Sequence, residues 1–356
     1  MQSVAAARAI AVRVGLAALS TAVALVLAEV LARSLAIDQR LLTASLFFQG
    51  ADIEVHRISA DPALHYELAP GTSCDCSVGG PAYHVTIDEH GARHPTHALA
   101  KAPGVYRIMA VGGSTVYGGA VDDAQTIPAA LERQLNADTA SPRRYEAWNF
   151  GTSAYMLRQA ADLARGRLDD VRPDLVLVQL YNSGRRAYLM PASYDALDYD
   201  WRALLADPDF FPEQFTFPWW LPAPISEPLM RRSALARAGI ALVPGFGPNR
   251  GCDWCERRDQ DAARALSSMA EARGIPVVYY AIPATRCAAD GTPEPDRPSP
   301  GAESVYPGLD AERFVDLFAA GREPAFYQVH PPPPILEEYA RLLVAALRAR
   351  GLLAPP

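Results

Sequence analysis

The chain has 356 residues, enough for one large domain or two small ones, and about half of them are hydrophobic. Its formal net charge of −7 leaves no basic stripe that could neutralise phosphates, so we expect no nucleic-acid partner. Proline is abundant, at 31 residues, which favours long ordered loops over a helical bundle. The composition therefore indicates a globular protein with a sizeable core.

An apolar segment lies near the N-terminus, at residues 14–32 (VGLAALSTAVALVLAEVLA), and Glu29 is its only charged residue. Its length is close to the ~20 residues that a helix needs to cross a bilayer. Arg8 and Arg13 precede it, which favours a cytoplasmic N-terminus and an exported remainder. We interpret the segment as an uncleaved membrane anchor. A signal peptide cleaved near residues 30–32 is the alternative, and a buried core helix is disfavoured because no polar face is present.

Five cysteines are compatible with export, but their odd number leaves at least one thiol unpaired unless it pairs between chains. Cys252 and Cys255 have the spacing of a redox or zinc half-site, yet no second cluster with a nearby histidine completes a zinc site. Proline and glycine precede the pair, which indicates loop-like surroundings rather than a strand. We interpret it as a structural disulfide or as idle thiols, and we expect no metal or organic cofactor.

Three regions follow from the pattern along the chain. Residues 1–36 form the cytoplasmic tip and the anchor. Residues 37–103, here called the lead-in, show little helical periodicity, although residues 84–88 alternate like a strand and residues 89–91 supply a turn. We expect the lead-in to lie close to the membrane and to pack on the main domain, residues 104–356.

Strands and helices alternate in the main domain. Strands are expected at 106–111 (YRIMAV), 145–150, 174–181 (DLVLVQLY) and 276–282 (PVVYYAI), and helices at 127–136 with Thr126 as its cap, 154–168, 260–273 and 335–350. This alternation predicts a mainly parallel sheet with helices on both faces, a three-layer α/β/α fold. It lapses at about 185–259, an aromatic and proline-rich insertion. Trp219 and Trp220 there indicate either a lid or acceptor-binding surface, or plain packing.

Polar residues follow the ends of the predicted strands. Gly112-Gly113-Ser114-Thr115 comes directly after the first strand, and the glycines permit a sharp turn that exposes Ser114. Val116 stands where the G-x-S-x-G elbow has its second glycine, and no phosphate-loop Gly-Lys-Ser/Thr follows. Further candidates at strand or helix ends are Gly151, Asn182 and His330. Because the ends of parallel strands share one edge, these residues could assemble an acyl-transfer site.

The four blocks, taken in order, resemble the SGNH, or GDSL-like, hydrolases over about residues 106–351. The resemblance implies a flavodoxin-like three-layer fold, with Ser114 as nucleophile and His330 as its base. It also implies an oxyanion hole made of the N–H groups of Ser114 and Gly151 and the side-chain amide of Asn182. Some members of the family also carry an N-terminal membrane helix and a strand-rich lead-in.

Three departures from the family pattern bear on activity. Tyr327 stands where the family has the aspartate that orients the histidine, Leu180 replaces the glycine of the third block, and residues 331–334 are all proline. An unoriented histidine is a weaker base, so a backbone carbonyl, Tyr327 or Glu323 would have to fix its tautomer.

The resulting expectation is an extracytoplasmic serine esterase or deacylase, anchored by a single membrane helix, that acts on O-acyl esters of a glycan or lipid. Two alternatives stay open. One is an O-acyltransferase that uses the same residues and passes the acyl group to a sugar. The other is a catalytically degenerate domain that serves as a membrane-tethered glycan-binding or assembly protein.

Overall fold

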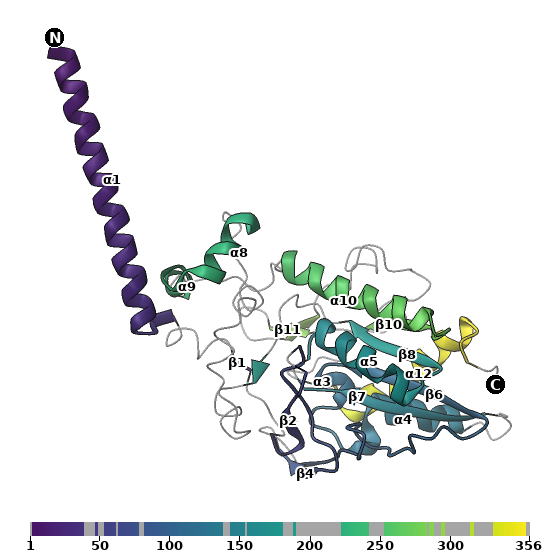
Figure 1. The fold of residues 1–356 in the computed structure, drawn as a ribbon. Helices are drawn as coiled ribbons and strands as arrows, with labels where there is room; N and C mark the ends of the chain where they lie inside the picture. The colour runs from purple at the N-terminus through teal and green to yellow at the C-terminus, as the bar shows by residue number, and fades with distance from the viewer. Residues whose placement is uncertain are drawn as a thin grey trace. The chain divides into compact units, whose positions relative to one another are not determined.

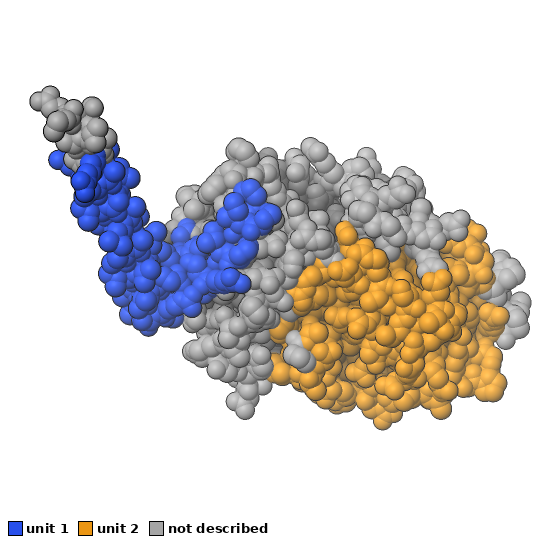
Figure 2. Space-filling view, turned by 45° about the horizontal axis from the view of Figure 1, so that its top comes forward, with its two compact units in different colours: residues 1–47, 201–252 blue, residues 48–200, 253–356 orange. Residues whose placement is uncertain are grey.

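The computed structural model describes residues 2–38, 47–48, 53–61, 63–77, 82–137, 143–153, 155–180, 188–189, 222–241, 253–282, 285–287, 293–295, 314–316 and 330–353 (Figure 1). The chain forms two compact units, residues 1–47 with 201–252 and residues 48–200 with 253–356 (Figure 2). These units do not coincide with the predicted domains, whose boundaries remain a prediction. Other predictions concern residues outside the described ones, namely Asn182, Trp219, Trp220, Cys252, Glu323 and Tyr327.

Three helices make up most of the described part of the first unit: α1 (Gln2–Ser34), α8 (Ala223–Arg232) and α9 (Ala234–Ala241). Residues Ile10–Ser34 are long and apolar enough to cross a bilayer, with a mean hydropathy of 2.2, and none of this helix's apolar window is buried. That exposure argues against a core helix and fits both an anchor and a signal sequence. Helix α9 packs against α1, and α8 against α9.

A parallel five-stranded sheet forms the centre of the second unit, in the order β13-β10-β8-β6-β7. The strands are β6 (Val105–Gly112), β7 (Arg144–Gly151), β8 (Leu175–Leu180), β10 (Val277–Ala281) and β13 (Phe314–Asp316). Counted along the chain, the order is 2-1-3-4-5, which is that of flavodoxin-like sheets. The predicted fold class is confirmed.

Helices cover both faces of this sheet. α4 (Ile127–Asn136) and α12 (Pro333–Ala349) pack together on one face, and α5 (Leu157–Val171) and α10 (Asp253–Glu271) pack together on the other (Figure 1). Alternate strand residues such as Ile108 and Ala110 join α4 and α12 in one apolar core. Because both faces are covered, β8 is buried along its whole length, as its apolar sequence predicts.

Two helices begin three or more residues away from their expected starts. Helix α5 begins at Leu157 rather than at 154, and α10 begins at Asp253 rather than at 260. The first turns of α10 (DWCERRD) are polar and carry no apolar periodicity, which is why the pattern missed them. Cys255 therefore lies in the first turn of a helix and not in loop-like surroundings. The described part of the insertion also contains α8 and α9, which the pattern did not predict.

Two short antiparallel ladders lie in the described part of the lead-in. η1 (Ile53–Val55) leads into β2 (His56–Ile58), which pairs with β3 (Tyr66–Leu68), and β4 (Ser73–Cys76) pairs with β5 (Tyr83–Thr86). Strand β5 confirms the predicted strand at 84–88. The remaining short elements are β1 (Phe47–Phe48) with β9 (Tyr188–Leu189), β11 (Thr285–Cys287) with β12 (Pro293–Pro295), α3 (Ser114–Tyr117) and η2 (Asp123–Gln125).

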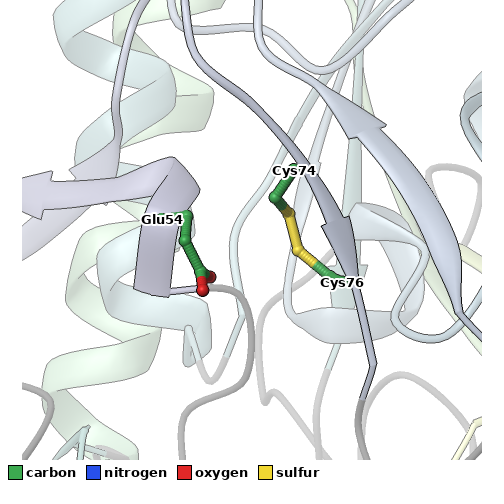
Figure 3. Close-up of side chains that lie close together, drawn as sticks. All are labelled: Glu54, Cys74 and Cys76. Atoms are coloured by element: carbon green, nitrogen blue, oxygen red, sulfur yellow. A yellow bond between two sulfur atoms is a disulfide. The ribbon is translucent and has the colours of Figure 1, made fainter.

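Cys74 and Cys76 form a disulfide within β4, and the Glu54 carboxylate lies within 4.8 Å of the sulfurs (Figure 3). Thiolates rather than disulfide sulfurs are the usual metal ligands. In this oxidised form the group therefore acts as a local crosslink of the lead-in, and Cys76 is buried in the apolar core of the lead-in.

Arg107 ties the amino-terminal end of β6 to its surroundings. Its side chain is fully buried, and Nε donates to Glu146 Oε2 at 2.9 Å. The other guanidinium nitrogens donate to the backbone carbonyls of Ala98, Leu99 and Val171. The bonds to Glu146 and to the Val171 carbonyl are buried, so losing the side chain would leave these two acceptors without a donor.

We therefore expect Arg107→Met to lower the free energy of unfolding by about 3–5 kcal/mol, because it strands a buried carboxylate. Arg341→Met is the matched control, since it removes a half-exposed pair with Glu338 and should cost less than about 1 kcal/mol. Urea denaturation followed by tryptophan fluorescence measures both values. Equal losses in the two variants would contradict the expectation.

Candidate active site

The turn after β6 presents Ser114. Gly113 caps α3 in an extended conformation, and the helix ends one turn later at Gly118, whose φ of 89° is left-handed. The N–H groups of Gly118 and Gly119 both donate to the carbonyl of Ser114, at 2.9 and 2.8 Å. This is the sharp turn that Gly112-Gly113 predicts, and it leaves Ser114 partly exposed at the carboxyl end of the strand.

Helix α3 is held between two apolar cores. Val116 is fully buried in the core that α4 and α12 share with the sheet. Tyr117, the next residue, is fully buried in the core of the lead-in, together with Val55, Leu68 and Val85. Since the side chains of both residues are fixed, the backbone that carries Ser114 has little freedom to move.

Gly151 ends β7 directly against α3. A Cβ at this position would lie 2.1 Å from the backbone nitrogen of Tyr117 and 2.5 Å from the carbonyl carbon of Val116, so no side chain fits. The N–H of Gly151 donates to Asn149 Oδ1 at 3.0 Å. Gly151 thus brings the helix onto the sheet. Its role as an oxyanion donor remains a prediction, and it would require the Asn149 side chain to release this N–H.

His330 lies at the Ser114 turn, although it comes from the far end of the sequence. A Cβ on Gly119 would lie 2.9 Å from both Cε1 and Nε2 of His330, so the imidazole rests on the Gly119 backbone. The N–H of the same glycine is bonded to the carbonyl of Ser114. The structure therefore brings Ser114 and His330 to one turn, but the described residues contain no hydrogen bond between their side chains.

Strand β8 leads toward Asn182, which itself lies outside the described residues. The strand ends at Leu180 in the middle of the sheet, beside β6, with Val178 opposite Val111. In the sheet order β13-β10-β8-β6-β7, the direction in which successive strands are added reverses between β6 and β8. Ligands of open α/β sheets bind at that point, outside the carboxyl ends of the strands.

Gln179 is a candidate site residue that the pattern analysis did not single out. It is buried near the end of β8, and its Oε1 lies 2.8 Å from where a Cβ on Gly112 would be. Within the part of the chain that the structure describes, this oxygen accepts no hydrogen bond. A buried acceptor without a donor is unfavourable, so it marks a place where a polar group could bind. The one polar residue in an otherwise apolar strand was the available signal.

Arg93 is the second residue that sequence analysis missed. Its side chain is fully buried, and Nε donates to Asp123 Oδ1 at 2.8 Å. Its terminal nitrogens donate to four backbone carbonyls, those of His84, Tyr117, Gly118 and Val121, at 2.6–3.1 Å. The guanidinium also lies over the Tyr117 ring, 4.9 Å from its centroid. Arg93 thus fixes the segment that immediately follows Ser114.

Comparisons with known proteins give structural likeness only. No family model matches the chain, and no curated protein matches it. Solved structures with a similar arrangement include TesA (14% identity, TM-score 0.39, covering 69% of this chain and 99% of that one). A second is an acylhydrolase-like protein from Bacteroides fragilis, with 14% identity and a TM-score of 0.37, covering 72% of this chain and 94% of that one. A third is AlinE4, an SGNH-hydrolase family esterase, with 17% identity and a TM-score of 0.24, covering 71% of this chain and 100% of that one. These values do not assign an activity, which must be inferred from the site.

Gly151→Ala should push β7 and α3 apart, because the added Cβ has no room against the α3 backbone. We expect it to lower the free energy of unfolding by about 1–3 kcal/mol. Gly166→Ala is the matched control on α5, where nothing lies within 4 Å of an added Cβ, and it should stabilise the helix by up to about 1 kcal/mol. Urea denaturation distinguishes them. Shifts in the same direction would contradict the close approach of β7 and α3.

Proposed function

We propose that this protein is a membrane-anchored serine esterase or deacylase of the SGNH type that acts on O-acyl esters of a glycan or lipid. One observation carries the proposal: the His330 imidazole rests on Gly119, whose N–H is bonded to the carbonyl of Ser114. The order of the four sequence blocks and the position of Ser114 at the reversal of the strand order support it.

The proposed reaction proceeds through an acyl-enzyme. Ser114 Oγ attacks the ester carbonyl, and His330 accepts its proton. The tetrahedral intermediate then expels the alcohol, which receives that proton from His330 as the C–O bond breaks. Water attacks the acyl group on Ser114 by the same steps, which releases the carboxylic acid and restores the serine. A sugar hydroxyl in place of water would make the same site an acyltransferase.

The developing oxyanion needs donors aimed at it, each worth roughly 3–4 kcal/mol. The N–H of Ser114 is the first of α3, and none of the described backbone carbonyls accepts it. Asn182 and Gly151 are the further donors that the family pattern supplies, and Gly151 would first have to be released by Asn149. We propose that the Ser114 N–H is the principal backbone donor.

Helix α1 would hold the second unit on the exported side of the membrane, where acylated glycans and lipids occur. Its exposed apolar length and the preceding arginines support this assignment.

A fluorophosphonate probe, which bonds to an activated serine with loss of fluoride, tests the catalytic pair. Labelling of the full-length protein should disappear in Ser114→Ala and in His330→Ala. Ser267→Ala is the control, because the Ser267 hydroxyl is bonded to Tyr279 at 2.7 Å and contributes nothing to the site. A folded wild-type protein that remains unlabelled would contradict the proposal and favour a glycan-binding protein.

Arg93 acts as a positioning residue in this proposal. Arg93→Lys keeps the charge beside Asp123 but cannot donate to all the carbonyls that the guanidinium binds. We expect kcat for a short-chain p-nitrophenyl ester to fall by about 10²-fold with little change in KM, because Ser114 is displaced while the binding surface persists.

Arg107→Lys is the matched control for this effect on kcat without an effect on KM. Arg107 is equally buried, but it lies five residues before Gly112 on β6, about 16 Å along the strand. This variant should lose stability with kcat nearly unchanged. If both variants lower kcat alike, Arg93 serves the fold in general and does not position Ser114.

A further inference from the structure

Glu29 is the charged residue that interrupts the apolar run of α1, and a carboxylate inside a membrane helix is costly. In the structure its oxygens are fully engaged. Oε1 accepts from the Arg33 Nε at 2.6 Å and from the Ala234 N–H at 3.0 Å. Oε2 accepts from Ser233 Oγ at 2.8 Å and from the Leu235 N–H at 2.9 Å. Such a residue normally marks a partner, and here the partner is the start of α9.

These bonds satisfy the N-terminus of α9, whose first N–H groups have no partner within the helix. Glu29 binds the N–H groups of Ala234 and Leu235, and Ser233 Oγ accepts the N–H of Ala236 at 3.0 Å. The Arg237 N–H then begins the helical series with the Ser233 carbonyl. A helix start with all its donors bonded is what a water-poor surrounding requires.

Further contacts fasten this junction within the first unit. Arg237 pairs with Asp38 at 2.7 Å, and Asp38 is buried. Arg33 donates to the carbonyl of Arg232, the last residue of α8. Ala234 and Ala238 are both buried on α9, and α9 packs against α1. The helical pair α8–α9 is therefore held at the C-terminal end of α1, as Figure 1 shows.

The level of this junction follows from helix geometry. The apolar helix from Ile10 to Ser34 has 25 residues, about 37 Å at 1.5 Å per residue. The hydrocarbon core of a bilayer is only about 30 Å thick. Glu29 lies seven residues beyond the midpoint of this helix at Ala22, about 10 Å along the axis. A helix centred in the bilayer therefore places Glu29 within about one helical turn of the boundary between acyl chains and headgroups.

Helix α8, whose last residue is bonded to Arg33 of α1, exposes an apolar face. Ile225 and Leu229 lie one turn apart on the same face and are 53% and 42% exposed. Among the described residues beyond 38, the only other exposed large apolar side chain is Leu99. Only Ser233 separates α8 from α9, and α9 is held by Glu29 to the apolar helix α1. An apolar face on a short helix in this position fits a bilayer surface.

We infer that the α8–α9 pair is a membrane-contacting surface: Glu29 clamps α9 to the anchor, and α8 inserts Ile225 and Leu229 into the lipid at the headgroup boundary. The inference rests on the proposed membrane anchor and adds a second contact with the bilayer. The partner is the phospholipid surface rather than a second copy of the chain, because α9 is bonded directly to the apolar helix α1 and α8 packs on α9.

Photocrosslinking tests this surface directly. The full-length protein, in vesicles of equal parts phosphatidylcholine and phosphatidylglycerol, carries p-benzoyl-phenylalanine in place of Ile225, Leu19 or Leu99. Mass spectrometry should find lipid adducts at positions 19 and 225 and none at 99. Adducts at 19 without adducts at 225, protein dimers at 225, or lipid adducts at all three positions would overturn the inference. An absence of adducts at 19 would overturn the anchor as well.

A substitution of Glu29 tests the bonds between Glu29 and the start of α9. In Glu29→Leu we expect lipid adducts at position 225 to fall about fivefold, which corresponds to about 1 kcal/mol of lost capping free energy. Glu29→Gln should restore part of the signal, because its amide oxygen still accepts. Thr21→Val is the control, since that hydroxyl only bonds Ala17 within α1. Adducts unchanged in Glu29→Leu would refute the clamp. Fluorophosphonate labelling of the same samples reports the catalytic site separately.

Discussion

The position of Ser114 depends on a buried cation, the guanidinium of Arg93. Taking such a charge out of water costs several kcal/mol unless a counter-charge and acceptors replace the solvent. Asp123 supplies the charge, and the carbonyls of the turn after Ser114 supply most of the acceptors. Because Arg93 comes from the lead-in, that segment and the nucleophile turn must fold together. The backbone of Arg93 strengthens the link, since its N–H donates to the Asn149 carbonyl at 2.8 Å.

Close backbone approach is the second constraint on the site. Gly151 brings β7 against α3, and Gly119 lets the His330 imidazole rest on the turn. A Cβ on Gly151 would meet the α3 backbone and is not tolerated, whereas a Cβ on Gly119 would have to displace the His330 ring. The parallel sheet explains why residues so distant in sequence meet: β6 and β7 end at one edge, and α12 starts just after His330. The turn that carries Ser114 is therefore contacted by the lead-in, by the sheet and by the residue just before the C-terminal helix.

The sequence predicts the repeating parts of this structure well. β6, β8 and β10 follow from apolar runs, and α4 from Thr126, which accepts the N–H of Ala129 as its cap. The turn at Ser114 follows from Gly112-Gly113. Periodicity missed the start of α10 and the whole of α8, because their first turns are polar or rich in proline.

What the sequence could not reveal are contacts made across the fold. Arg93 and Arg107 look alike in the sequence, yet only the topology places the first at the turn that follows Ser114 and the second at the opposite end of β6. Gln179 left a signal, since it is polar in an apolar strand, but its partner Gly112 is known only from the register of β6 and β8. Glu29 was conspicuous for the same reason, and its partners lie far along the chain, at the start of α9.

The most direct test of the central claim is a crystal structure of the protein after reaction with a phosphonate. The account predicts a phosphorus bonded to Ser114 Oγ, with a phosphonyl oxygen facing the Ser114 N–H and the His330 ring against Gly119. Density on a different serine, or a His330 ring turned away from Gly119 in the adduct, would contradict it.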